Sequence, residues 1–513
     1  MGITLSPPIP LFGKDGFADM LEQIDLEQTI SKADYKKQAA QLRQELSVLA
    51  QQVRQAKLPV LLLFEGWGAA GKGNLISKLI AQFDPRGFRV YSNAAREPFE
   101  QRRPLLWRYW QQLPERGQIA VLDRSWYQDI SVGRIEEDLS DAQFQRRVNS
   151  ILAMERQLTD DGYLILKFFL HISRKEQKAR FESLTQHKNT QWRVTEQDWR
   201  RNRHYDRYFR AFDDMLSATN TPNAPWHILS CDDKYSPRLA MLQIVRDQLQ
   251  AALQRQKQPT SPSIQEPVFP GPFVLTPMPE LSQVSLEQRV EDEVYKKRLN
   301  QLQKELADLH NKIYRKQVPV IIGYEGWDAA GKGGNIKRVT AALDPRGYEV
   351  IPIAAPSREE LNHQYLWRFW NHIPKTGHIA IFDRTWYGRV MVERIEGFCS
   401  QADWHRAYQE INEFERELWD WGAVVIKFWL HIDQNEQLAR FHDRQNTPEK
   451  RWKITDEDWR NREKWPLYEQ AVNDMLHYTS TDFAPWHIIE SQDKKYGRLK
   501  ALQIILDEIN KRL

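Results

Sequence analysis

Cysteine is scarce in this 513-residue sequence, which holds only Cys231 and Cys399. The two stand far apart and show no spacing typical of zinc ligands, so neither a disulfide framework nor a zinc site is expected. No run of about eighteen apolar residues is free of charge, and we therefore predict no membrane span. The first residues lack a basic stretch followed by an apolar one, so no signal peptide is predicted. These absences favour a cytoplasmic protein.

An excess of one charge is also missing, because 73 Lys and Arg residues stand against 69 Asp and Glu residues. This balance gives no argument for bulk binding to nucleic acid or to a membrane, so an anionic partner must be held by a local basic site. The chain is rich in apolar residues, with 41% hydrophobic residues and 19 tryptophans. Such a composition indicates folded globular domains, about two to four of them for this length.

The sequence contains an internal repeat. The segment FEGWGAAGKGN, from Phe64 to Asn74, returns 260 residues later as YEGWDAAGKGG, from Tyr324 to Gly334. The same offset relates LDRSWY to FDRTWY, KFFLHI to KFWLHI and APWHIL to APWHII, without a gap. An ungapped match of this length predicts two copies of one domain rather than a solenoid of short repeats.

A proline-rich stretch, QKQPTSPSIQEPVFPGPFVLTPMPE, separates the two copies. Proline favours extended conformations and stops helices, so we predict a semi-rigid linker here. We expect an N-terminal domain over residues 1–256, the linker over 257–280 and a C-terminal domain over 281–513.

Within each copy, strand-like and helix-like patterns alternate. Apolar runs such as VPVIIGYEG, HIAIFDR and AVVIKFWLHI stand between amphipathic stretches, for example 403–421 and 456–478. Nearly continuous apolar runs are typical of parallel strands that are covered on both faces. The pattern predicts two α/β domains, each with a parallel sheet of about five strands flanked by helices.

A phosphate-binding loop is predicted by GWDAAGKG, from Gly326 to Gly333, which follows a strand and opens a helix. Small residues such as Gly331 and Gly333 let backbone N–H groups face phosphate oxygens, and Lys332 adds a positive charge. Gly333 replaces the Ser or Thr that binds Mg²⁺ in an ordinary P-loop, so we expect Asp328 to be the substitute ligand. The alternative is a glycine-rich turn without a ligand.

The segment IAIFDRTWYGR places Asp383 at the end of an apolar strand, which is the Walker B arrangement. Asp383 is expected to bind the metal or to position the attacking group. Arg384 and Arg389 follow closely and can hold phosphate oxygens in bidentate fashion. Taken alone, an Asp after a strand is as readily a helix cap, but the neighbouring phosphate loop favours the functional interpretation.

A basic stretch, ARFHDRQNTPEKRWKI, carries Arg440 and Arg444 on one helix face and continues with Lys450 and Lys453. One interpretation is a solvated helix flank. The other is a lid that closes over phosphates and excludes water. Glu393 follows the Walker B segment, and its spacing alone does not place it in the site.

Together these motifs resemble the polyphosphate kinase 2 family, in particular its two-domain class, whose typical activity is polyphosphate:AMP phosphotransfer. The resemblance rests on GWDAAGKGG, DPRGYEV, LWRFW, FDRTWYGRVMVERIEGF and RFHDRQNTPEKRWKITDEDW, and with the twin copy it covers nearly the whole chain outside the linker and the N-terminal tail. It implies a thymidylate-kinase-like P-loop fold with a helical lid, Mg²⁺ as cofactor and inorganic polyphosphate as donor. The residues that match the family's motif positions are Asp328, Lys332, Asp383, Arg384, Arg389, Glu393, Arg440 and Arg444. The resemblance also implies a metal or nucleotide contact for Glu393 and a contact with the phosphate chain for Arg444.

The first copy keeps part of this set and loses the rest. The residues that persist in it are Lys72, Asp123, Arg124 and Arg180, at the positions of Lys332, Asp383, Arg384 and Arg440. The residues that change are Asp328 to Gly68, Arg389 to Asp129, Glu393 to Gly133, Arg444 to Leu184 and Lys450 to Thr190. An Asp in place of an Arg repels a polyanion. We therefore expect catalysis in the second copy and little or none in the first.

The leading hypothesis is Mg²⁺-dependent transfer of a terminal phosphoryl group from polyphosphate to AMP, giving ADP. Transfer to nucleoside diphosphates or to several nucleotides stays open as an alternative. So does an ordinary ATP-dependent nucleotide kinase, although Gly333 and Asp328 argue against it. The first copy is then a structural or polyphosphate-binding module. The expected partners are polyphosphate and a nucleotide, with a homo-oligomer left open and neither nucleic acid nor a membrane expected.

Overall fold

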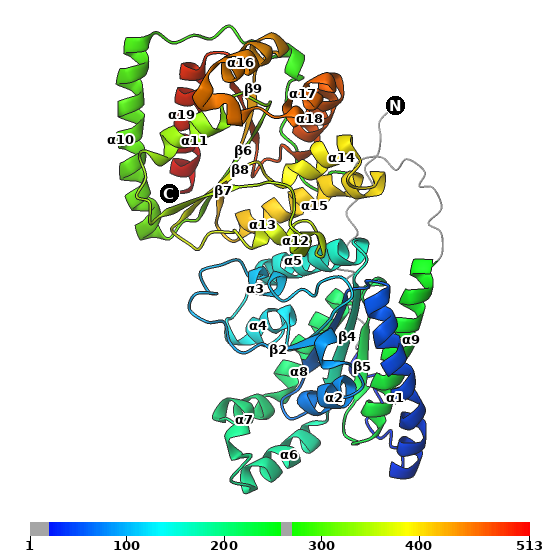
Figure 1. Ribbon diagram of the computed structural model, residues 1–513. Coiled ribbons are helices and arrows are strands. Elements are labelled where there is room, and N and C mark those ends of the chain that lie inside the picture. Colours follow the sequence, from blue (N-terminus) through cyan, green and yellow to red (C-terminus); the bar gives the residue numbers. More distant parts are fainter. Residues whose placement is uncertain (1–19, 258–268) are drawn as a thin grey trace, which may run out of the picture. The chain divides into compact units, whose positions relative to one another are not determined.

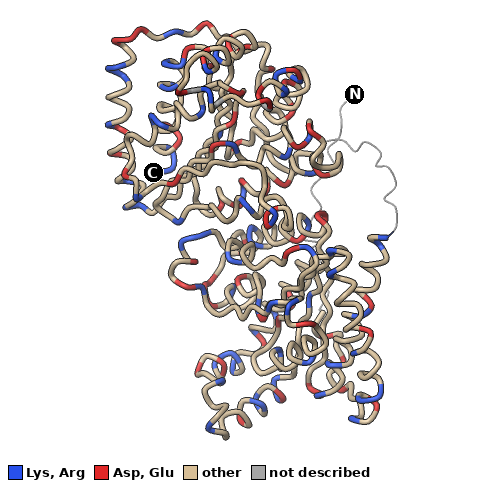
Figure 2. Tube along the Cα trace, viewed as in Figure 1, with Lys and Arg blue, Asp and Glu red and all other residues tan. Residues whose placement is uncertain are grey.

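Figure 1 shows the fold as a computed structural model, which describes residues 20–257 and 269–513. The chain divides into two compact units, one drawn mainly from the first copy and the other mainly from the second. The predicted linker over 257–280 falls partly on residues 258–268, which lie outside the described residues. Within the two described ranges, no helix is both long and apolar enough to cross a membrane. Figure 2 shows basic and acidic residues interspersed along both units.

The first copy is built on a parallel five-stranded sheet in the order β2–β3–β1–β4–β5. Its strands are β1 (Val60–Gly66), β2 (Phe88–Ser92), β3 (Ile119–Asp123), β4 (Leu164–His171) and β5 (Trp226–Ser230). Its α-helices are α1 (Lys32–Gln55), α2 (Lys72–Ile80), α3 (Trp107–Trp110), α4 (Val132–Glu136), α5 (Asp141–Asp160), α6 (Arg174–Gln186), α7 (Glu196–Arg203), α8 (Tyr205–Thr219) and α9 (Ser236–Lys257). Every residue of β1 and β4 is buried, as expected for strands that helices cover on both faces.

The second copy repeats this sheet, and its order is β7–β8–β6–β9–β10. Its strands are β6 (Val320–Gly326), β7 (Tyr348–Pro352), β8 (Ile379–Asp383), β9 (Val424–His431) and β10 (Trp486–Glu490). Its α-helices are α10 (Asp292–Lys316), α11 (Lys332–Thr340), α12 (Arg358–Leu361), α13 (Trp367–Trp370), α14 (Val392–Glu396), α15 (Gln401–Asp420), α16 (Gln434–Asn446), α17 (Asp456–Glu463), α18 (Trp465–Thr479) and α19 (Lys494–Arg512). The predicted α/β class and the five-stranded parallel sheets are confirmed.

Six short 3₁₀ helices complete the described secondary structure. They are η1 (Pro85–Gly87), η2 (Trp126–Asp129), η3 (Gln191–Arg193), η4 (Leu281–Gln283), η5 (Trp386–Val390) and η6 (Pro448–Lys453). Helices cover both faces of each sheet. In the second copy, α19 packs against α10, α11, β9 and β10, whereas α15 packs against α18 and β9.

The strand order brings the two predicted phosphate motifs to one edge of the sheet. The central strand β6 pairs with β8, and Tyr324 lies opposite Asp383. On its other side β6 pairs with β9 as far as Gly326 and Leu430. The loop after β6 therefore begins beside the carboxyl end of β8, at the point where the strand order reverses, which is the usual ligand position in open parallel sheets.

A buried ion pair ties the second sheet to its helices. On β9, the Nζ atom of Lys427 lies 2.7 Å from Glu415 Oε2 on α15, 2.8 Å from the hydroxyl of Tyr387 and 2.6 Å from the carbonyl oxygen of Thr479. The side chains of Lys427 and Glu415 are 1% and 0% exposed. The first copy repeats this ion pair with Lys167 and Glu155, so it belongs to the fold rather than to one active site.

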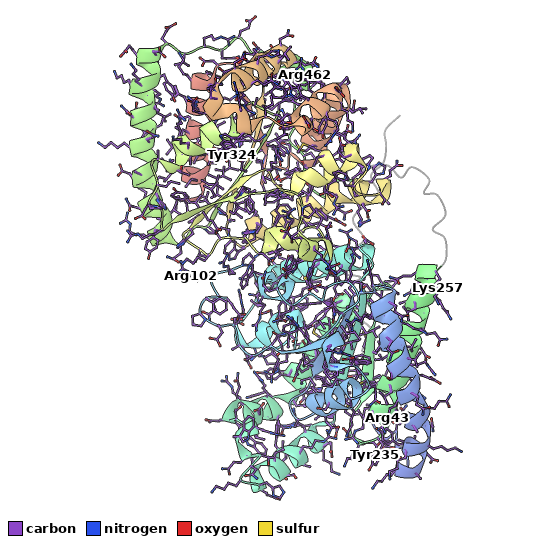
Figure 3. The ribbon with its side chains drawn as sticks, viewed as in Figure 1. Arg43, Arg102, Tyr235, Lys257, Tyr324 and Arg462 are labelled. Carbon is purple, nitrogen blue, oxygen red and sulfur yellow. The ribbon has the colours of Figure 1, made fainter. Side chains whose placement is uncertain are left out.

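The hydroxyl of Tyr324, labelled in Figure 3, is buried and has no hydrogen-bond partner in the described part of the chain. The first copy has Phe64 at this position. An unsatisfied buried polar group costs about 1–3 kcal/mol. We therefore expect Tyr324→Phe to raise the free energy of unfolding by about 1 kcal/mol. A urea titration of the variant measures this change, and a clear loss of stability would show that the hydroxyl has a partner.

Candidate functional site

The loop after β6 has the backbone of a phosphate cradle. Gly326 has a φ of 151°, and a Cβ atom there would lie 2.6 Å from the carbonyl oxygen of Leu430, so only glycine fits. At the other end, Gly331 has a left-handed φ of 113° and precedes α11, which begins at Lys332 without a side-chain cap. The first N–H groups of α11 are therefore available to an anion, and the helix dipole favours one there.

Arg440 supports this loop from α16. Its guanidinium donates to the carbonyl oxygens of Ala329 and Ala330, each at 3.0 Å. The remaining N–H groups donate to Glu436 at 2.6 Å and to the carbonyl oxygens of Ser491 and Gln492. Arg440 is 5% exposed, and burial lowers its pKa. All five N–H groups are thus used inside the protein in this conformation.

Lys332 reaches back over the loop. Its Nζ atom donates to the carbonyl oxygen of Gly326 at 2.7 Å, which holds the ammonium group above the start of the loop. An ammonium group has three N–H donors, so it can also contact a phosphate oxygen.

Two carboxylates stand near the loop, as the sequence predicts. Asp328 lies within the loop, where its Oδ2 accepts from Asn461 Nδ2 at 3.1 Å and its Oδ1 is 3.7 Å from Arg384 Nη2. Asp383 ends β8, in register with Tyr324 on β6. Arg384 follows it with a left-handed φ of 68°. Asp328 and Arg384 are thereby in contact, and the strand pairing places Asp383 at the same edge of the sheet.

The donor set fits Mg²⁺. In the described residues, no group of three or more His, Cys, Asp and Glu side chains is placed to hold a metal ion. Mg²⁺ typically takes one or two carboxylates and completes its shell with water and substrate phosphates. Asp328 and Asp383 are two carboxylates of this kind at one edge of the sheet.

A third carboxylate, Glu325, is buried at the end of β6. Its Oε1 accepts from the backbone N–H of Thr385 at 2.7 Å and from the Thr385 hydroxyl at 2.8 Å. Burial raises the pKa of Glu325, while the charge of Lys332 and the bonds from Thr385 act against this rise. Glu325 is not among the site residues predicted from the sequence motifs. The signal was present as the shared EGW triplet of both copies.

Arg389 and Glu393 form an ion pair of their own. The Nη1 atom of Arg389 lies 3.0 Å from Glu393 Oε2, and the guanidinium lies 4.4 Å from the ring centre of Tyr365. Arg389 therefore contacts Glu393 and an aromatic ring, and the Cys399 thiol donates to its carbonyl oxygen. A contact of Arg389 and Glu393 with a substrate stays a prediction.

The basic stretch and the residues around it form α16, η6 and α17. Arg462 on α17, labelled in Figure 3, donates to the carbonyl oxygen of Gln434 at 2.6 Å and so joins α17 to α16. Lys464, just after α17, pairs with Glu396 of α14 at 2.8 Å. Arg444 lies in the last turn of α16. The backbone of η6 carries Lys450 and Lys453, whose side chains lie outside what the structure describes.

The first copy has a pocket of about 470 Å³ at the same place, part of it open to solvent, and Gly68, Lys72 and Arg124 line it. A Cβ atom on Gly68 would lie 3.3 Å from Asp198 Oδ1, so a carboxylate at this position would meet another one. Asp129, the counterpart of Arg389, is half-buried, and the loss of water around its carboxyl group raises its pKa to about 6.

Comparison with known proteins assigns this arrangement to a family. Residues 29–257 and 289–513 each match the family described as Polyphosphate kinase 2. The chain belongs to the polyphosphate kinase 2 family. A family member from Pseudomonas aeruginosa, named Polyphosphate:AMP phosphotransferase, is 40% identical over 491 residues, which cover 96% of this chain and 98% of that protein. A protein of the same name from Acinetobacter johnsonii is 38% identical and covers 88% of this chain and 90% of its own length.

Solved structures give the same result for the polyphosphate kinase 2 fold. A crystal structure of a polyphosphate kinase 2 from Pseudomonas aeruginosa superposes with a TM-score of 0.83 at 38% sequence identity, covering 96% of this chain and 99% of that one. Another P. aeruginosa relative, named ADP-polyphosphate phosphotransferase, is 38% identical but matches only 42% of this chain. The tandem arrangement is thus shared with relatives that match nearly the whole chain.

Proposed function

We propose that this family member transfers the terminal phosphoryl group of inorganic polyphosphate to AMP, giving ADP, and that the second copy carries the reaction. One observation supports this most strongly: relatives named for that activity share both copies over nearly the full length of the chain. The geometry of the second copy is compatible with it, because a phosphate loop, a lysine and two carboxylates meet at one edge of a sheet.

In this proposal the loop and Lys332 hold the phosphoryl group that moves. N–H groups at the start of α11 and the ammonium of Lys332 neutralise its oxygens, and Arg384 adds a further positive charge. Asp328 and Asp383 would hold Mg²⁺, which lowers the charge repulsion between donor and acceptor phosphates. Gly331 and Gly333 let the phosphates approach the backbone.

The transfer itself needs no covalent bond to the protein. An oxygen of the AMP phosphate attacks the terminal phosphorus in line, a new P–O bond forms, and the bond from that phosphorus to the bridging oxygen breaks. The shortened polyphosphate leaves with the electron pair. The protein positions the two phosphates and neutralises their charge, which supplies most of the catalysis. The lid of α16 and α17 excludes water that would hydrolyse the donor.

The roles of the other predicted residues follow from their surroundings. Arg440 enters as a support of the loop rather than as a phosphate ligand, since its N–H groups are already used. Arg389 and Glu393 would act as a pair beside the site. Arg444, Lys450 and Lys453 would contact the phosphate chain from the lid, where positive charge is needed along the donor.

We also propose domains over 1–256 and 281–513, joined by a linker over 257–280, with the first domain inactive and serving as a structural or polyphosphate-binding module. Gly68 removes the loop carboxylate that Asp328 supplies in the second copy. Arg180 donates to the carbonyl oxygens of Ala69 and Ala70, as Arg440 does in the second loop. The first loop therefore keeps its support while losing a proposed metal ligand.

A product assay tests the proposed function. Purified full-length protein is incubated with Mg²⁺ and either polyphosphate or ATP, together with a panel of nucleoside mono- and diphosphates. We expect ADP from polyphosphate and AMP as the fastest reaction, and none of it in excess EDTA. Turnover of AMP with ATP but not with polyphosphate would support an ordinary nucleotide kinase instead. Faster turnover of ADP than of AMP would support the diphosphate alternative.

A further inference from the structure

The buried carboxylate of Glu325 has one oxygen with partners and one without. Oε1 accepts both hydrogen bonds from Thr385. Oε2 accepts no hydrogen bond within the described ranges. Glu325 as a whole is only 5% exposed, but this oxygen is not fully enclosed by the protein. It is therefore an acceptor that water or a ligand at the site can reach.

The first copy shows what happens when the same oxygen is occupied. There Glu65 also accepts from the residue after the Walker B arginine, Ser125, through its backbone N–H and its hydroxyl. Its Oε2, however, accepts from the side-chain amide of Gln128. Gln128 lines the pocket of the first copy, beside Lys72. The exposed fraction of Glu65 is 1%.

Position 388 of the second copy corresponds to Gln128 and is a glycine. Gly388 has no side chain that could donate to Glu325 as Gln128 donates to Glu65. The charges of Lys332 and Arg384 act on the carboxyl group of Glu325. The open oxygen thus lies in the same positive field that is proposed to receive the phosphates.

We propose that Glu325 is a positioning residue of the second copy, whose free Oε2 accepts a hydrogen bond from a water molecule that hydrates the bound phosphates and their cation. This inference rests on the proposed function of the same site. The two copies then differ in one more feature. The first copy lacks the loop carboxylate, and its Gln128 also occupies the Oε2 atom of the buried carboxylate Glu65. Mutation of a carboxylate that positions a metal-bound group from outside the first coordination shell typically lowers metal affinity or activity by about 10–100-fold.

Three variants of the full-length protein test this inference. Gly388→Gln closes the oxygen as Gln128 does, and Gly388→Ala is the matched control. A Cβ atom at position 388 would lie 3.7 Å from Val392 Cγ1, which is an ordinary contact. Glu325→Gln keeps an oxygen for both Thr385 bonds and replaces the free acceptor by an N–H donor. The rate of ADP formation, the melting temperature and calorimetric binding of ADP with and without Mg²⁺ are measured for each.

We expect the kcat of Gly388→Ala to stay within about twofold of that of the unaltered protein. The kcat of Gly388→Gln and of Glu325→Gln is expected to fall by about tenfold or more, while their melting temperatures stay unchanged. In the absence of Mg²⁺, Gly388→Gln and Glu325→Gln are expected to bind ADP with the same affinity as the unaltered protein. Mg²⁺ is expected to raise the ADP affinity of the unaltered protein but not that of these two variants. Equal rates for Gly388→Gln and Gly388→Ala would overturn the inference, as would full activity of Glu325→Gln. Inactivity of the unaltered protein towards polyphosphate and AMP would refute the proposed function, while the ADP-binding comparison would still test Glu325.

Discussion

Replacing Asp328 by glycine is expected to lower the rate of ADP formation from polyphosphate and AMP by about 100-fold or more, because the change removes a proposed metal ligand from the transfer site. The variant reproduces the first loop, in which Gly68 occupies this position. Arg384 and Asn461, which contact Asp328, would lose a partner that is 18% exposed, so the fold should tolerate the change. Initial rates over a range of Mg²⁺ concentrations measure the effect.

The reciprocal variant, Gly68→Asp, serves as the matched control. We expect no gain in activity from it, because the first copy still has Asp129 in place of Arg389 and Gly133 in place of Glu393. Appreciable activity retained by Asp328→Gly, together with a higher rate in Gly68→Asp, would contradict the proposed division between the copies.

Replacing Lys427 by methionine is expected to destabilise the second unit by about 3–5 kcal/mol, because it leaves the carboxylate of Glu415 buried without its counter-ion. Lys427 also donates to Tyr387 and Thr479, so the change removes further hydrogen bonds. Urea unfolding followed by tryptophan fluorescence measures the loss. The transitions of the two units need not coincide, so the later and earlier transitions are fitted separately.

A double variant separates charge burial from packing. Adding Glu415→Gln to Lys427→Met removes the buried charge, and the amide oxygen can still accept from Trp386 and Tyr387, as Oε1 of Glu415 does. We expect the double variant to recover a good part of the lost stability. A single variant within about 1 kcal/mol of the unaltered protein would show that Glu415 becomes neutral at little cost.

The sequence was sufficient to predict the fold and the loop. The pattern of apolar runs predicted the parallel sheets, and the G-x-x-x-x-G-K motif predicted a strand-to-helix turn that the structure has at Gly326–Lys332. These features depend on short stretches of sequence, such as the glycine at 326 that must avoid Leu430. Local patterns of this kind can be recognised without knowing which distant segments pack together.

Side-chain partners could not be predicted in this way, because they depend on how distant segments pack. Arg440 appeared as one of several lid cations, but α16 passes under the loop and directs its N–H groups to loop carbonyls. This support also accounts for the persistence of Arg180 in the first copy. The losses of Arg389 and Glu393 appeared as two separate changes. The structure pairs these residues, so the two changes together remove one ion pair, and Asp129 stands where Arg389 was.

A comparison of the two copies could not single out Glu325. It is present in both copies, and comparison of the copies draws attention to what differs. Only the hydrogen bonds show that the difference lies in a neighbour, Gln128 against Gly388. A shared residue can thus have a different role in each copy when its surroundings change.

We propose one working site for this chain, in the second copy. The most direct test measures ADP formation from polyphosphate and AMP by two full-length variants, Lys332→Ala and Lys72→Ala, which remove the same ammonium group from the two equivalent loops. We predict that Lys332→Ala loses about 100-fold or more of the rate and that Lys72→Ala keeps it within about twofold. A large loss in Lys72→Ala with little change in Lys332→Ala would contradict the account.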